Sequence, residues 1–107
     1  MQEKDQRYLN EDEPEAKQLY TKIAADTDFI KAGWHIFSLL RQQDKVELQV
    51  MGKEAVYITC KAIIAARGNL LAYGADLYFY PEFVTVEIDG EKRSALRFVV
   101  ERVKPEE

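Results

Sequence analysis

The sequence has few of the residues from which metal, redox and hydrolytic sites are built. It holds one cysteine, Cys60, and one histidine, His35, so neither an internal disulfide nor a Cys/His metal cluster can form. A glycine-rich phosphate loop, a pair of catalytic carboxylates and a hydrolase nucleophile elbow are all absent. We therefore expect no catalytic residue, no metal, no cofactor and no enzymatic activity.

Long apolar runs are also missing. No stretch approaches the roughly 20 apolar residues that a helix needs to cross a bilayer. The first 17 residues are charged throughout and lack the apolar centre of a signal peptide. These absences predict a cytoplasmic protein with no membrane partner, and one that is nucleoid-associated if its partner is nucleic acid.

The acidic charge is concentrated at the start of the chain. The net charge is −4, and residues 1–16 hold six acids and two bases, whereas the rest of the chain holds 13 of each. A polar, acidic segment buries too little apolar surface to offset the entropy lost on ordering. We predict a flexible acidic leader over residues 1–16, a single domain over 17–104 and a tail over 105–107.

Apolar periodicity predicts strand, helix and strand in the first half of the domain. Leu19–Ala25 alternates as a strand, and Asp26-Thr27-Asp28 supplies the cap of a helix over 29–43. Trp34 lies on the apolar face of that helix, so we expect it in the core. Val46–Val50 alternates as the second strand.

The second half predicts a helix followed by two strands. Residues 54–67 are apolar nearly all round, with a stop at Gly68-Asn69, and a helix with so little polar surface needs cover from a partner subunit. The third strand spans 75–86 and is expected to break or bulge at Pro81. Asp89-Gly90 predicts a type I′ turn, and a fourth strand follows over 95–103.

A series of short motifs carries a family resemblance. In order they are Ala66-Arg67-Gly68, Gly74-Ala75-Asp76-Leu77, Pro81-Glu82-Phe83, Ile88-Asp89-Gly90-Glu91 and Arg93-Ser94-Ala95-Leu96. With them the chain resembles the stage V sporulation protein S (SpoVS) family, a relative of the Alba nucleic-acid-binding proteins, over residues from about 19 to 103. The resemblance implies an α/β fold of the α+β sandwich type, Alba-like in its β-α-β-α-β-β order, with a four-stranded mixed sheet and two helices on one face. It also implies a homodimer or higher oligomer, binding of DNA or RNA, and a regulatory role in bacterial development or sporulation.

The charges of this chain depart from the Alba pattern. Alba proteins bind through a basic loop after the first strand and through the hairpin of the last two strands. Here that loop, Ala25–Asp28, is acidic, and the hairpin sets Glu87, Asp89 and Glu91 against Lys92 and Arg93. Carboxylates oppose the phosphate contacts that dominate nucleic-acid affinity. Two interpretations stay open: a nucleic-acid-associated regulator, and an oligomeric scaffold or protein-interaction module of the same fold without strong nucleic-acid binding.

Two groups of side chains are candidate site residues. The candidate nucleic-acid-binding bases are Lys31, Lys53, Lys61, Arg67, Lys92, Arg93 and Arg97. The candidate stacking or interface residues are Tyr78, Tyr80 and Phe83, where the alternative is packing against a second subunit or against the leader. For the hairpin bases the alternative is cross-strand pairing with Glu87 or Glu91. We expect His35 at the surface or an interface, and Cys60 as a small buried hydrophobe.

Overall fold

The computed structural model describes residues 7–9 and 19–104. In chain order the elements are β1 (Arg7–Leu9), β2 (Leu19–Ile23), α1 (Phe29–Gln42), β3 (Lys45–Val50), α2 (Lys53–Leu71), β4 (Leu77–Ile88) and β5 (Glu91–Arg102). From β2 onward this is the predicted β-α-β-α-β-β order.

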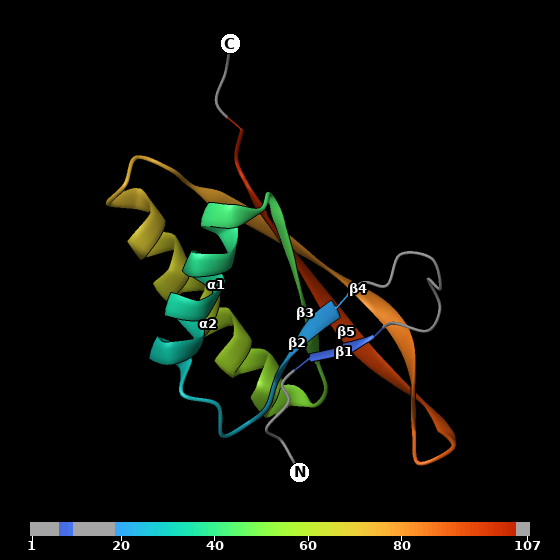
Figure 1. Ribbon diagram of the computed structural model, residues 1–107. Coiled ribbons are helices and arrows are strands. Elements are labelled where there is room, and N and C mark those ends of the chain that lie inside the picture. The colour runs from blue at the N-terminus through green and yellow to red at the C-terminus, as the bar shows by residue number, and fades with distance from the viewer. Residues whose placement is uncertain (1–6, 10–18, 105–107) are drawn as a thin grey trace.

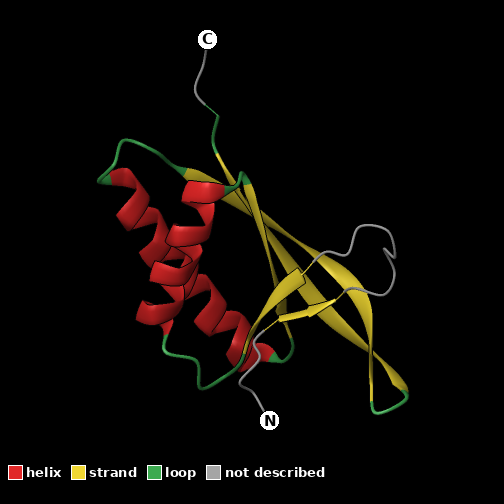
Figure 2. Ribbon diagram, in the orientation of Figure 1, coloured by secondary structure: helices red, strands yellow, loops and turns green. Residues whose placement is uncertain are grey.

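The elements form two layers, with both helices packed on one face of a mixed sheet (Figures 1 and 2). The strand order is β1-β2-β3-β5-β4, in which β2 and β3 are parallel and the other neighbours antiparallel. The predicted α+β architecture is thus confirmed for the four expected strands. The structure adds β1, a short edge strand within the predicted leader. The remainder of residues 1–16 lies outside the described residues.

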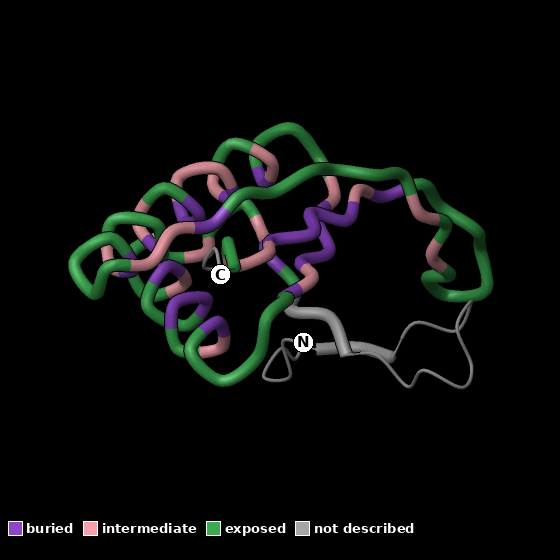
Figure 3. The backbone as a smooth tube through the Cα atoms, turned by 90° about the horizontal axis from the view of Figure 1, so that it is seen from above, coloured by how far each residue is buried: buried purple, intermediate pink, exposed green. Residues whose placement is uncertain are grey.

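The core lies between the sheet and the helices. Because side chains alternate between the two faces of a strand, every second residue of the central strands points into this core. Val46, Leu48 and Val50 of β3 are buried, as are Phe98 and Val100 of β5, and all belong to one apolar cluster. The helices complete that cluster with Ile36, Phe37, Leu40, Ala55, Ala62, Ile63, Ala66 and Leu70. Figure 3 shows this burial in the middle of the molecule, while β4 is exposed along most of its length.

Helix α1 begins where its cap predicts. Asp28 Oδ1 accepts hydrogen bonds from the backbone N–H groups of Ile30 at 3.0 Å and Lys31 at 3.3 Å, which satisfies two free donors of the first turn. The prediction that Trp34 lies in the core is wrong, because its side chain is 54% exposed. The buried face of α1 consists of Gly33, Ile36, Phe37 and Leu40, and Trp34 lies outside that face.

Helix α2 is longer than predicted, and the stop expected at Gly68-Asn69 is wrong. The helix continues to Leu71 because Leu70 is buried in the core, and that burial outweighs the cost of about 1 kcal/mol of a helical glycine. The helix is closed instead at Gly74, whose φ is 78°. There the Ala75 N–H donates to the Leu70 carbonyl at 3.0 Å, as in a Schellman motif.

Strands β4 and β5 form a long hairpin without interruption. The register runs from Leu77 opposite Arg102 to Ile88 opposite Glu91, so the break or bulge expected at Pro81 is wrong. Because β4 is an edge strand, a residue without an N–H is tolerated there. Asp89 and Gly90 have φ values of 53° and 80°, which confirms the type I′ turn. The expected start of the last strand at Ala95 is also wrong, since pairing reaches the turn.

Candidate nucleic-acid interface

The hairpin of β4 and β5 extends beyond the helix layer to one end of the molecule (Figure 1). Its register sets Glu87 opposite Lys92 and Val86 opposite Arg93. Neighbouring residues of a strand point to opposite faces, so Lys92 and Arg93 present one positive charge on each side of the ribbon. Both residues are exposed. The predicted cross-strand arrangement of Glu87 and Lys92 agrees with this register.

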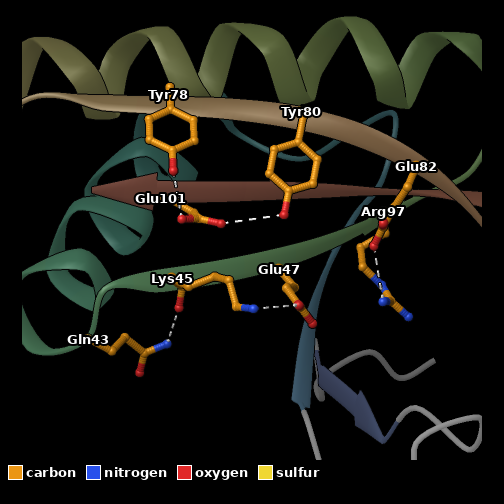
Figure 4. Close-up of polar contacts among 8 residues, drawn as sticks. All are labelled: Gln43, Lys45, Glu47, Tyr78, Tyr80, Glu82, Arg97 and Glu101. Carbon is orange, nitrogen blue, oxygen red and sulfur yellow. Dashed lines mark hydrogen bonds and ion pairs between the residues drawn. The ribbon is translucent and has the colours of Figure 1, made fainter. Parts of the chain in front are cut away.

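Arg97, further along β5, is less accessible to a phosphate group than Lys92 and Arg93 are. It lies on the sheet face turned away from the helices, is only 8% exposed, and its Nη1 donates to Glu82 Oε2 at 3.2 Å (Figure 4). The two residues are directly opposite in the β4–β5 register. A cation that is buried and paired contributes little to phosphate binding, so the hairpin's exposed bases are Lys92 and Arg93.

Arg67 is held in a structural pair. Its Nε donates to Asp76 Oδ1 at 2.6 Å and its Nη2 to Oδ2 at 3.1 Å, and Asp76 Oδ1 also accepts the Leu77 N–H at 2.7 Å. The hydrogen bond from Arg67 and then that from Leu77 lower the pKa of Asp76 from 3.8 to about 2. The pair ties α2 to the start of β4, although nine residues separate its members.

Asp76→Asn is expected to lower the thermal midpoint at neutral pH. A carboxyl whose folded-state pKa is depressed stabilises the fold fully above its unfolded pKa, and that stabilisation is lost as the pH falls through the folded value. The difference in midpoint between wild type and variant should therefore be constant above about pH 4 and shrink towards pH 2. Circular-dichroism melts at pH 7, 4 and 3 measure it. A difference that stays constant over this range would contradict the role given to the pair.

Lys61 lies between the two helices. Its Nζ is 4.3 Å from the ring centroid of Phe29 at the start of α1 and 4.9 Å from that of Tyr57 on α2. A cation over two ring faces stabilises the contact between helices. Lys61 therefore has a structural role in addition to any contact with phosphate.

The structure thus divides the seven candidate bases. Lys31, Lys53, Lys92 and Arg93 are exposed, whereas Lys61, Arg67 and Arg97 have the partners described above. The beginnings of α1 and α2 and the hairpin tip lie toward the same end of the molecule (Figure 1). Asp26, Asp28, Glu54, Asp89 and Glu91 are exposed at that end as well, so its charge is mixed.

The three candidate aromatic residues lie on two faces, as alternation predicts. Tyr78 and Tyr80 are on the face away from the helices, where their hydroxyls donate to Glu101 Oε1 at 2.8 Å and Oε2 at 3.4 Å (Figure 4). The bond to Glu101 raises the pKa of Tyr78. Phe83 is on the helix-facing side and is 81% exposed. No single stacking surface contains all three residues.

Large apolar side chains are exposed on α2 and on the helix-facing side of β4. Tyr57, Ile64 and Leu71 are spaced at seven residues, about two turns, and form one stripe along the outer side of α2. Phe79 and Phe83 are exposed on the helix-facing side of β4, and the ring of Phe79 stacks on core Phe98. We call these five residues the apolar strip. Among residues 7–9 and 19–104, therefore, no other segment covers these apolar side chains of α2.

Sequence reasoning missed a cluster at the opposite end. The guanidinium of Arg41 lies 5.6 Å from the ring centroid of Phe37 and 5.1 Å from that of Tyr73, and Trp34 packs edge-on against Phe37. Arg41 and Tyr73 are 32 positions apart and come together only through the packing of α1 on α2. The one local signal was an aromatic residue, Tyr73, placed directly before the glycine that closes α2.

The last two residues considered from the sequence are His35 and Cys60. His35 is exposed on α1, as expected, and Cys60 is half-buried against the core rather than fully buried. Within the described residues no helix combines the length and the apolar character that crossing a membrane requires. In the same part of the chain no three His, Cys, Asp or Glu side chains are grouped to hold a metal ion.

A two-layer α+β fold with a projecting hairpin defines the structural class. The family model described as Stage V sporulation protein S (SpoVS) matches residues 20–103. The chain belongs to that family, as its C-terminal motifs predicted. The family membership indicates a sporulation-related role, and the match begins within β2 and ends just after β5.

Proposed function

We propose that this protein is a cytoplasmic, non-enzymatic regulator that acts as a homodimer and associates with nucleic acid. The observation that carries the proposal is the projecting hairpin, whose bases Lys92 and Arg93 are exposed on opposite faces. A ribbon of this kind contacts phosphates from either side, and a dimer presents two of them. Membership of the SpoVS family supports a role in sporulation or a related developmental process.

The apolar strip supports the homodimer. Soluble monomers rarely expose large contiguous apolar patches, and Ile64 and Phe83 are 69% and 81% exposed here. The strip combines side chains of α2 with side chains of the edge strand β4. A two-fold axis through such a surface would bring the same residues of two copies together. Such an isologous contact covers the outer side of α2 without any other protein.

The hairpin bases are tested with a charge-removing variant. Lys92→Gln with Arg93→Gln is expected to weaken binding of a 30-base-pair duplex at low salt. It should also reduce the slope of log K against log salt by about 2 for each hairpin that contacts the duplex, since each phosphate contact contributes about 0.9. Fluorescence anisotropy of a labelled duplex from 20 to 200 mM salt measures both quantities. Lys45→Gln, a base on the outer sheet face that pairs with Glu47 at 3.8 Å, is the matched control and should leave the slope unchanged.

The second candidate function is an oligomeric scaffold of the same fold. The acids that surround the hairpin bases and the two helix starts favour it, because they oppose phosphates. Absence of binding to duplex and to single strands at 20 mM salt would overturn the nucleic-acid proposal in favour of this one. Equal binding by the Lys92/Arg93 variant and the wild type would show that the hairpin is not the contact.

A further inference from the structure

Three chain segments meet at the end of the molecule opposite the hairpin tip. They are the end of α1, the turn that closes α2, and the end of β5 (Figure 1). The Arg102 N–H donates to the Asp44 carbonyl and the Val103 N–H to the Asp76 carbonyl, both at 2.9 Å, which places β5 between the other two segments.

Exposed aromatic rings extend from the middle of α1 to the turn that closes α2. Trp34 is 54% exposed and Tyr73 is 66% exposed, and both pack against the buried ring of Phe37, at centroid distances of 5.6 and 5.4 Å. Their outer surfaces are therefore fixed in position by a core residue while being open to solvent. Rings of this kind are the surfaces on which unpaired bases stack.

One cation lies against these rings, and two more lie at the end of α1. The guanidinium of Arg41 lies over the rings of Phe37 and Tyr73, and the residue is exposed. Arg102 Nη1 donates to the Leu40 carbonyl, and Arg102 and Lys104 share Asp44, at 2.6 and 3.7 Å. Two of these three cations, Arg102 and Lys104, thus share one carboxylate. The nearby pair of Arg67 and Asp76 is neutral.

We propose that this aromatic–arginine cluster, made of Trp34, Tyr73 and Arg41 with Arg102 and Lys104 beside it, binds single-stranded nucleic acid. An unpaired base stacks on an exposed ring, and the adjoining phosphates contact the cations. A polymer that alternates planar bases with negative phosphates matches both the rings and the excess positive charge. The inference rests on the proposed association with nucleic acid, but it concerns a separate site with a preference for unpaired strands.

Trp34 is the only tryptophan, so its fluorescence reports on this site directly. Titration with a 15-nucleotide oligothymidylate at 20 mM salt is expected to quench the emission saturably, and a duplex of equal length should quench it much less. Tyr73→Ala should weaken the binding at least fivefold. Arg41→Gln should also reduce the salt slope by about 0.7, the contribution of one phosphate contact on a single strand. Both residues are exposed, and thermal melts verify that the variants fold.

Two control variants test whether the oligonucleotide binds at the aromatic–arginine cluster rather than at the hairpin, and whether the acids at the C-terminus contribute to binding. The Lys92→Gln/Arg93→Gln variant should show the same quenching as wild type, even if its duplex binding is lost. A variant with Glu106→Gln and Glu107→Gln, two acids that follow Lys104 in the sequence, should bind the oligonucleotide at least as tightly.

Three results would overturn the proposal. The first is binding by anisotropy without any change in Trp34 emission. The second is equal quenching by polyglutamate, which has charge but no bases. The third is an emission that changes with protein concentration alone, because a second copy would then cover the ring.

Discussion

Gly33→Val is expected to destabilise the protein by about 3 kcal/mol. A Cβ at Gly33 would lie 2.7 Å from the Cβ of Ala65 and 3.1 Å from the carbonyl oxygen of Ala62, across the closest approach of α1 to α2. The Ala62 oxygen is backbone and cannot move aside, so the helices must separate and the core beneath them must open. Urea denaturation monitored by circular dichroism measures the loss.

Gly68→Ala is the matched control for this prediction. Gly68 is also a helical glycine without a positive φ, and a Cβ there meets no atom within 4 Å. This substitution is expected to stabilise the protein by about 1 kcal/mol through helix propensity alone. A Gly33→Val variant as stable as wild type would show that the two helices are further apart than the structure places them.

A double-mutant cycle tests the contact itself. Because the Cβ of Ala65 is the nearest atom, Ala65→Gly should recover part of the stability lost in Gly33→Ala, whereas the backbone contacts at Ala62 and Ala66 keep the recovery incomplete. Strictly additive losses would mean that the two positions do not touch.

Phe83→Glu combined with Ile64→Glu is expected to convert the proposed dimer into a monomer. Each substitution places a charge in the apolar strip, where desolvation without a partner is costly. Hot-spot residues are worth about 2–4 kcal/mol, so each substitution should raise the dimer dissociation constant roughly 30- to 700-fold. Sedimentation velocity over a concentration series should give a mass of twice 12.4 kDa for wild type and 12.4 kDa for the variant.

Ile88→Glu provides the control for the dimer prediction. Ile88 lies on the same strand as Phe83 but, five residues further along, on the opposite face of the hairpin. The dimer should persist in this variant. A wild-type protein that sediments as a monomer at all concentrations would contradict the role given to the apolar strip.

Features with a local physical cause were predictable from the sequence. The carboxylate of Asp28 caps α1 because its bonds reach only two and three residues along the chain. Asp89-Gly90 defines a turn because both residues tolerate positive φ. The alternation of side chains also predicted that Leu77 and Tyr78 lie on opposite faces of the sheet. This alternation is local as well, because it depends only on the pleat of one strand.

Features that depend on distant parts of the chain were not predictable in this way. The helix stop at Gly68 failed because the core position of Leu70 decides where α2 ends. The partners of Arg67 and Arg97 lie nine and 15 residues away, so these bases could not be distinguished from solvated ones by spacing alone. The exposure of Trp34 depends on where α2 crosses α1. The apolar pattern of the α1 sequence carries no information about that crossing point.

An NMR titration of the uniformly ¹⁵N-labelled protein with a short duplex at low salt tests the central claim most directly. We predict that the largest amide shifts fall on the hairpin, between Val86 and Ser94, and that they diminish as salt rises. Unchanged spectra at saturating duplex, or shifts that avoid the hairpin altogether, would contradict the proposal that this projecting ribbon is where the protein meets nucleic acid.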